Sequence, residues 1–161
     1  MTRPLGVLAA ALALAACTGE PPGEQLTRAG DVATYARDVH PYLEASCATL
    51  DCHGDRGRPL RLYAETGLRA DAALRGQPIT EAELRANVAA LIGIDPSAGP
   101  DDHLALRKPL SQGEGGIAHV GPKLWRNRDD PGYRCLRAWL SGGSDPAACA
   151  AALAPVALPP P

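Results

Sequence analysis

Phenylalanine is absent from this chain of 161 residues, and aromatic residues make up only 4% of it. No apolar run is long enough to cross a bilayer, because the run at residues 5–14 falls well short of the roughly 20 residues that a transmembrane helix needs. The formal net charge is −2, and the charged residues are interspersed without a basic stripe or an aromatic ladder. These absences exclude a membrane-spanning protein, and they exclude nucleic acid as a partner.

The N-terminus has the features of an export signal. A cationic start at Arg3 precedes the apolar run, which has the length of a secretory signal core. The residues 14–17 read LAAC, which is similar to the bacterial lipobox, where cleavage occurs before the cysteine and its sulfur and amine are acylated. We therefore expect a lipoprotein signal peptide at residues 1–16 and a lipid anchor on Cys17 that holds the protein on a membrane. The alternative is an ordinary signal peptide followed by an unrelated cysteine.

Composition divides the exported chain into three parts. Residues 17–30 are polar and rich in Pro and Gly, which is typical of a flexible tether behind the lipidated cysteine. Residues 31–149 form the expected folded domain, and residues 150–161 form an Ala/Pro-rich tail that we expect to be disordered or loosely packed. Thr18, rather than Asp, follows the cysteine, which by analogy with known lipoproteins favours the outer membrane of a bacterial envelope.

Capping residues and hydrophobic periodicity predict three helices in the folded domain. Asp31 is the N-cap of the first helix, which Pro41 kinks or divides. A capping box that begins at Thr80 opens the second helix. The third helix begins at Asp129 or Asp130, with Pro131 in its first turn, and ends at Gly142 and Gly143. The residues expected on the buried faces are, helix by helix, Val32, Tyr35, Val39, Tyr42 and Leu43; Leu84, Val88, Leu91 and Ile92; and Tyr133, Leu136, Trp139 and Leu140.

The predicted fold is therefore mainly α, with three or four helices joined by long loops and no pair of strands. Such an arrangement offers a thin apolar core for a domain of this length. Long loops in a compact domain need disulfides or a bound group to organise them. A large apolar cofactor at the centre would supply the missing core.

Four cysteines remain once Cys17 is assigned to the lipid anchor, in a chain exported to an oxidising compartment. Cys135 and Cys149 lie on and just beyond the last helix, and a disulfide between them would pin the tail back onto it. Cys47 and Cys52 frame the segment ASCATLDCHG, which ends as a c-type haem attachment site ends but has four residues between its cysteines in place of two. The segment is open to three interpretations: haem attachment, a short disulfide loop, or part of a zinc site.

Three segments of the sequence together resemble a known protein family. A helix with an apolar face, CATLDCHG and a C-terminal helix ending DDPGYRCLRAWLSGG resemble a small bacterial c-type cytochrome domain of the lipoprotein-anchored kind, over about residues 31–143. The resemblance implies a cytochrome c-like helical fold with one covalent haem c. Cys47 and Cys52 would form the thioethers, and His53 would be the proximal iron ligand. Some multihaem cytochromes also place four residues between the two cysteines.

The sixth iron ligand cannot be methionine, because the only methionine is Met1, which is removed with the signal peptide. His119 is the first candidate, since it lies in a glycine-rich loop shortly before the last helix, where distal ligands of this family are common. His103 is the second candidate, and His40 lies too close to the attachment segment to reach across the haem. An open sixth position that binds a small ligand is the remaining alternative.

The expected function is that of a membrane-tethered monohaem electron carrier whose partners are redox proteins of the bacterial envelope. The sequence contains no nucleophile elbow, HExxH motif or phosphate loop, so we expect no enzymatic activity. The alternative is a non-haem, disulfide-stapled envelope lipoprotein that acts as a binding or structural module.

Overall fold

The computed structural model of the protein describes residues 30–154. The expected signal peptide, Cys17 and all but the last residue of the expected tether lie outside these described residues, as do residues 155–161. Within residues 30–154 the secondary structure is helical, and strand-like pairing is limited to two isolated bridges, Tyr63 with Leu68 and Leu110 with Trp125. The mainly α prediction is therefore confirmed. No helix in the described part of the chain is both long and apolar enough to span a membrane.

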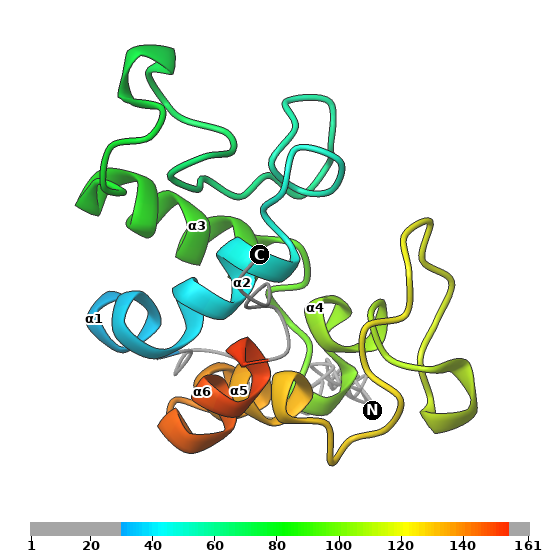
Figure 1. Cartoon of the computed structure of the whole chain (residues 1–161). Helices are drawn as coiled ribbons and strands as arrows, with labels where there is room; N and C mark the ends of the chain where they lie inside the picture. Colours follow the sequence, from blue (N-terminus) through cyan, green and yellow to red (C-terminus); the bar gives the residue numbers. More distant parts are fainter. Residues whose placement is uncertain (1–29, 155–161) are drawn as a thin grey trace, which may run out of the picture.

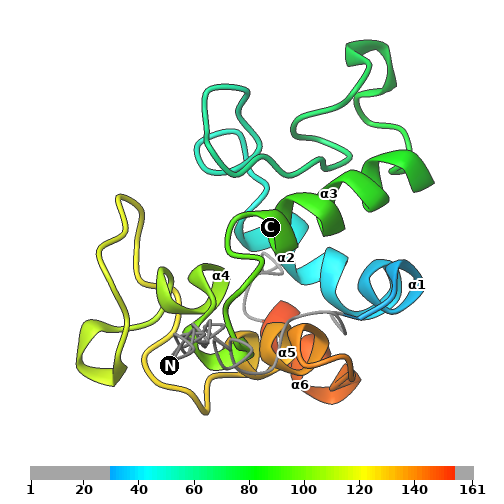
Figure 2. The same ribbon diagram turned by 180° about the vertical axis from the view of Figure 1, so that it is seen from behind.

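Ten short helical elements follow one another within residues 30–154. In Figure 1 the continuous segment α1–η1–α2 lies between α3 above it and α5 and α6 below it, and Figure 2 shows the same order from behind. The elements are α1 (Val32–Thr34), η1 (Tyr35–Val39), α2 (His40–Ser46), η2 (Ala72–Leu74), α3 (Glu81–Gly93), η3 (Pro100–Asp102), α4 (Leu104–Arg107), η4 (Gln112–Glu114), α5 (Pro131–Leu140) and α6 (Pro146–Leu153).

The first helical segment begins where its sequence predicts. An Asp31 carboxylate oxygen accepts a hydrogen bond from the backbone N–H of Thr34 at 2.8 Å, which satisfies one of the free donors at the helix start. The helix is not broken at Pro41 but widens into the π-helical turn η1 just before it. A proline ring excludes the regular hydrogen bond and crowds the carbonyl one turn earlier, and the wider turn accommodates both effects.

The helix α3 has the predicted capping box, in which the Thr80 hydroxyl accepts from the Glu83 N–H and the Glu83 carboxylate accepts from the Thr80 N–H. Its most buried residues, however, are Glu83, Asn87 and Leu91. The predicted apolar face of Leu84, Val88 and Ile92 is only partly buried, and of that set Leu91 alone is fully buried. Polar groups of the preceding loop bond to Glu83 and Asn87, and they turn that side of the helix inward.

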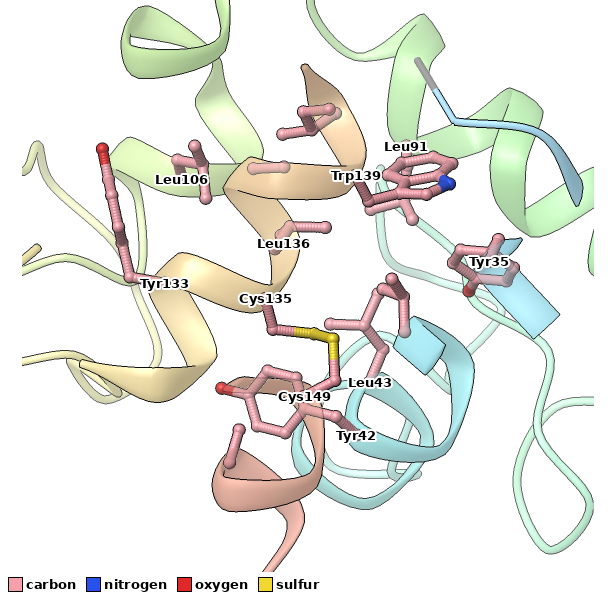
Figure 3. Close-up of a cluster of buried hydrophobic side chains, with 14 of the residues drawn as sticks. Tyr35, Tyr42, Leu43, Leu91, Leu106, Tyr133, Cys135, Leu136, Trp139 and Cys149 are labelled. Carbon is pink, nitrogen blue, oxygen red and sulfur yellow. A yellow bond between two sulfur atoms is a disulfide. The ribbon is translucent and has the colours of Figure 1, made fainter. Parts of the chain in front are cut away.

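The C-terminal helices α5 and α6 pack together and are joined by a disulfide between Cys135 and Cys149 (Figure 3), the pairing that the sequence favours. The predicted boundary at residue 149 is too early, since α6 continues to Leu153. The alanines of residues 150–152 were expected in the tail, but Asp145 caps this helix by accepting from the Ala148 N–H, and alanine is the best helix former.

Removing this disulfide with the double substitution Cys135→Ser and Cys149→Ser is expected to lower the free energy of unfolding by about 3 kcal/mol. The loop that the bridge closes has a sequence separation of 14 residues, and closing a loop of this size restricts the unfolded chain by that amount. Urea unfolding followed by circular dichroism measures the change. A midpoint equal to that of the wild type would show that packing of α5 on α6 suffices without the covalent bond.

The core joins residues from every helical layer, including Tyr35, Leu43, Leu91, Leu136 and Trp139, as Figure 3 shows. Both tryptophans are at most 1% exposed, as expected for core residues. The indole Nε1–H of Trp125 donates to the Tyr42 hydroxyl at 2.7 Å and so ties the long loop before α5 to α2. Gly132 fits at this junction because a Cβ there would overlap that hydroxyl and the indole nitrogen.

Candidate functional site

The loop from Cys47 to Gly54, hereafter the Cys47 loop, is compact although it holds four residues between its cysteines. Cys47 caps the end of α2, and its carbonyl accepts from the His53 N–H at 2.8 Å. The Thr49 carbonyl accepts from the N–H groups of Cys52 at 3.0 Å and Gly54 at 2.9 Å. The chain therefore turns back on itself, and this turn brings the backbone of His53 beside that of Cys47.

Two glycines permit this turn. A Cβ on Gly54 or on Gly67 would overlap the carbonyl oxygen of Ala48, so only glycine lets these backbones approach so closely. The glycine of the Cys-His-Gly sequence thus has a structural reason that is specific to this longer loop.

The thiols of Cys47 and Cys52 are free, in contrast to the disulfide-bonded Cys135 and Cys149. Both free cysteines are half-buried. Burial, and to a smaller extent the neighbouring Cys52, raises the pKa of the Cys47 thiol to about 12. The Cys47 thiol is therefore neutral at physiological pH and weakly reactive toward external oxidants.

The ring of His53 is oriented by a backbone carbonyl. Its Nδ1 lies 3.0 Å from the carbonyl oxygen of Leu60, and a carbonyl can only accept, so Nδ1 carries the proton and Nε2 holds a lone pair. Burial lowers the pKa of His53 below its ordinary value, and the hydrogen bond with the Leu60 carbonyl offsets only part of this effect. A neutral imidazole with an oriented free nitrogen is the form that binds metals.

The ring of His119 is oriented in the same way. It lies in the loop of residues 115–123, hereafter the His119 loop, and its Nδ1 is 3.2 Å from the carbonyl oxygen of Pro122. Its Nε2 is therefore also left with a lone pair. Gly121 leaves room for this ring, since a Cβ at that position would lie 3.0 Å from the His119 Cε1.

The structure brings these two histidines together although 66 positions separate them in the sequence. Their ring centroids are 6.3 Å apart and their planes differ by 20°. A metal–imidazole bond is about 2.0 Å long and the ring centre lies roughly 1.2 Å beyond the nitrogen, so two imidazoles on opposite sides of one ion have centroids about 6.4 Å apart. The observed separation therefore fits two axial ligands of one metal.

Cationic side chains hold the His119 loop against the body of the protein. Lys123 Nζ donates to the carbonyl oxygens of Lys108, at 2.7 Å, and of Ile117. The backbone N–H of Ile117 donates to the Arg107 carbonyl at 3.0 Å. These contacts fix the position of the loop that carries His119.

Apolar side chains are exposed beside both histidines. Leu50 in the Cys47 loop is 50% exposed, and Val120 next to His119 is fully exposed. In the described part of the chain these are the two large apolar residues with such exposure. Each of the two loops therefore exposes one large apolar side chain that could contact a bound group or a partner.

The other candidate histidines lie elsewhere. His103 is fully buried and caps α4, where its Nδ1 accepts from the Ala105 N–H at 3.2 Å. Its role is therefore structural, and it does not accompany His53. His40 is buried in α2 beside Tyr35, with its Nε2 3.4 Å from a Glu44 carboxylate oxygen, and burial lowers its pKa.

The two cysteines and two histidines of this site are recognisable in the sequence, but the groups that orient the histidines are not. The carbonyls of Leu60 and Pro122 carry no sequence signal, because every residue has a carbonyl. The role of Lys123 in holding the His119 loop is recognisable only from its contacts in the structure. Among residues 30–154, no group of three or more His, Cys, Asp or Glu side chains is arranged to hold a metal ion by itself. A haem iron, by contrast, needs only two protein ligands, since the porphyrin supplies the rest.

The chain was also compared with known proteins. No family model, no curated protein and no solved structure matches it.

Proposed function

We propose that this protein is a membrane-tethered, monohaem c-type cytochrome that carries electrons in a bacterial envelope. The observation that carries the proposal is the pair of His53 and His119, each with Nδ1 bonded to a carbonyl, a free Nε2 and centroids 6.3 Å apart. Two such imidazoles would be able to hold a haem iron between them, and the iron would supply electron-transfer chemistry.

The residues around this pair fit the cofactor. Cys47 and Cys52 are unpaired thiols on the loop that carries His53, so both are free to form thioethers with one haem c. The exposed side chains of Leu50 and Val120 offer apolar contact to a porphyrin face. Bound haem would supply a one-electron redox couple, and Cys47, Cys52, His53 and His119 would hold it.

Axial ligation by two histidines favours electron transfer over catalysis. With both positions filled, the iron has no place for a substrate, so we propose no enzymatic activity. Replacement of a thioether ligand by imidazole also lowers the reduction potential relative to a methionine-ligated iron. The proposed partners are redox proteins of the envelope, which the protein reaches from the lipid anchor at Cys17 over its tether.

The alternative is a non-haem, disulfide-stapled lipoprotein. The bond between Cys135 and Cys149 agrees with either proposal. The alternative, however, requires a second disulfide bond between Cys47 and Cys52, and these thiols are unpaired. It also does not explain why two histidines from distant loops lie close together, each with its Nδ1 hydrogen-bonded to a backbone carbonyl oxygen. We therefore prefer the cytochrome.

The experiment that tests the axial pair is substitution of the distal histidine. His119→Ala is expected to convert a low-spin absorption spectrum to a high-spin one and to allow carbon monoxide to bind the reduced protein, because it opens the sixth position. Val120→Ala is the matched control in the same loop and is expected to stay low-spin. A low-spin spectrum in His119→Ala, with a high-spin one in His103→Ala, would overturn the assignment of the distal ligand.

A further inference from the structure

Charge is divided unevenly over the described chain. The two segments that carry the paired histidines, residues 51–61 and 107–126, hold seven cationic and three acidic residues, for a net charge of +4. The rest of residues 30–154 holds seven cationic and thirteen acidic residues, for a net charge of −6. A protein whose overall formal charge is −2 thus has two strongly cationic segments, and these are the segments that carry His53 and His119.

Ion pairing follows the same division. Outside the two segments, six of the seven cationic side chains of residues 30–154 form ion pairs with carboxylates, and Arg75 is the exception. Inside the segments, none of the seven does so within the described chain. The unpaired cationic residues of the segments are Arg56, Arg58, Arg61, Arg107, Lys108, Lys123 and Arg126. Five of the seven are exposed, and Arg107 and Lys108 are half-buried. Because no carboxylate neutralises them, their charge contributes to the field outside the protein.

Contacts place several of these charges on the two site loops. The Arg58 guanidinium donates to the carbonyl oxygens of Asp51, at 2.9 Å, and Cys52, at 3.1 Å. Lys108 Nζ reaches the carbonyl oxygen of Ala118 at 3.5 Å, directly before His119. We call the surface formed by the seven cationic residues together with Leu50 and Val120 the cationic face. The face has apolar side chains beside the histidines and positive charge around them.

We propose that the cationic face is the docking surface for an acidic redox protein. This inference rests on the proposed function, because docking there brings the partner to the cofactor. Seven cationic groups exceed the two carboxylates of one haem, so most of the charge remains for a partner. Two exposed apolar side chains ringed by charge match a protein interface with a small apolar centre and a polar rim.

The direction in which salt changes the rate of oxidation by ferricyanide distinguishes an effect of the cationic face from an effect of the net charge of the whole protein. A protein of net charge −2 with evenly spread charge repels ferricyanide, so its oxidation by ferricyanide accelerates as salt is added. The cationic face attracts the anion, so we expect the rate to fall as salt rises from about 10 mM to about 200 mM, where the Debye length shortens from roughly 30 Å to below 10 Å. Oxidation by tris(phenanthroline)cobalt(III), a cation, is expected to show the opposite trend.

Paired variants locate the effect. Arg61→Gln with Arg126→Gln is expected to slow oxidation by ferricyanide at low salt at least about fivefold, and neither side chain contacts the loop that carries His119. Arg75→Gln with Arg85→Gln removes the same charge away from the face, at exposed positions, and is expected to change the rate less than about twofold. Arg61→Lys with Arg126→Lys is expected to retain the wild-type rate. Equal slowing by the two Gln pairs, or a wild-type rate that rises with salt, would overturn the proposal.

A second measurement separates failure of this inference from failure of the proposed function. The full chain with Cys17→Ser, which prevents lipidation, is loaded on a cation-exchange column at pH 7 whether or not it contains haem. Retention that is lost on Arg61→Gln with Arg126→Gln supports the face even in a colourless protein, and absence of retention overturns it. Binding to phosphatidylglycerol vesicles through the same residues would overturn the assignment to a protein partner and indicate a membrane surface.

Discussion

Substitution of both Cys47 and Cys52 by alanine is expected to abolish covalently bound haem. Both thiols are free in the structure and lie on the loop that carries His53, so they are the available sites for thioether formation. A denaturing gel stained for haem peroxidase activity measures the result. The wild type is expected to give a stained band at its own mass, and the double variant none.

The controls are chosen to separate attachment from folding. Cys135→Ser with Cys149→Ser removes the same number of cysteines and is expected to retain the stained band, because those sulfurs are joined to each other away from the Cys47 loop. Each single variant at Cys47 or Cys52 keeps one thioether position and is expected to give a weaker band. A stained band of full strength in the Cys47→Ala, Cys52→Ala variant would contradict the assigned attachment site.

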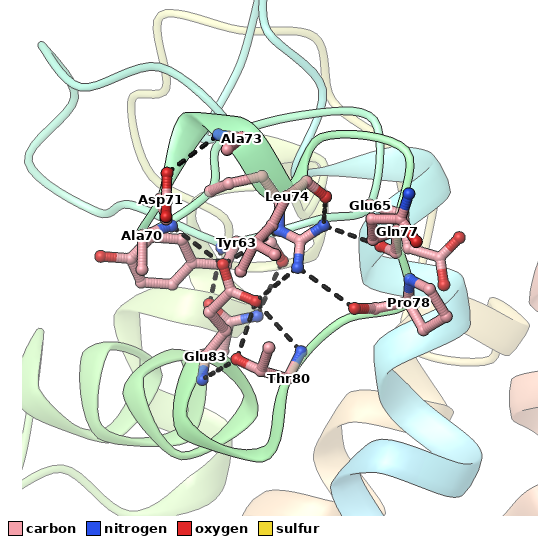
Figure 4. A network of polar contacts seen from close by, with 12 residues as sticks. Tyr63, Glu65, Ala70, Asp71, Ala73, Leu74, Gln77, Pro78, Thr80 and Glu83 are labelled. Carbon is pink, nitrogen blue, oxygen red and sulfur yellow. Dashed lines mark hydrogen bonds and ion pairs between the residues drawn. The ribbon is translucent and has the colours of Figure 1, made fainter.

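Glu83→Gln is expected to lower the free energy of unfolding by about 3 to 5 kcal/mol, because it leaves the buried Arg69 guanidinium without its counter-charge. Both side chains are at most 2% exposed. Arg69 Nε and Nη2 donate to the two Glu83 carboxylate oxygens at 3.0 and 2.8 Å. Figure 4 shows that the backbone of Ala70 and the hydroxyl of Thr80 converge on the same carboxylate.

The Arg69 guanidinium also fixes the loop that precedes α3. It donates to the carbonyl oxygens of Leu74, Gln77, at 2.7 Å, and Pro78, at 3.1 Å. Loss of the pair is thus expected to loosen this loop as well as α3. Urea unfolding is the measurement, and Glu81→Gln is the control on the same helix turn. Because the Glu81 side chain is 72% exposed, its ion pair with Arg85 is worth at most about 1 kcal/mol. Equal losses in the two variants would contradict this account.

The same pair predicts how stability depends on pH. Arg69, followed by the N–H groups of Ala70 and Thr80, lowers the pKa of Glu83 to about 2 from an ordinary 4.5. A lowered pKa stabilises the fold above pH 4.5, and that contribution is lost as the pH falls toward 2. The wild type should therefore lose about 3 kcal/mol from this group across the window, whereas Glu83→Gln should lose much less there.

Local signals in the sequence predicted much of the fold. The N-cap at Asp31 and the capping box at Thr80 both occur in the structure, because caps depend on residues only a few positions apart. The prediction of which side of α3 is buried was wrong in part. Arg69 and Tyr63, in the loop that precedes α3, bond to Glu83 and Asn87 and so turn these two residues inward. The second half of α6, from residue 150, fell in the expected tail because a run of alanine is compatible with a helix and with a loosely packed tail.

Part of the candidate site could likewise be predicted from the sequence, and part of it could not. Cys47, Cys52 and His53 are adjacent in sequence, so their motif could be read directly. The choice between His119 and His103 could not be settled from the sequence, because it depends on how a loop of more than ten residues returns to the Cys47 loop. The contacts of Lys123 and Lys108 that hold this loop in place involve backbone carbonyls, which no residue pattern reveals. Similarly, the sequence does not show which cationic side chains form ion pairs, so it does not show that those of the cationic face have no carboxylate partner.

The most direct test of the cytochrome proposal is a pyridine haemochrome spectrum of the acid–acetone-extracted protein, produced in a host with active cytochrome c maturation genes. Haem that is held only by its axial ligands is removed by this extraction, whereas thioether-bound haem stays with the chain. The proposal predicts a c-type band at one haem per chain after extraction. A colourless protein from that host, with mass spectrometry showing Cys47 and Cys52 joined in a disulfide, would contradict it.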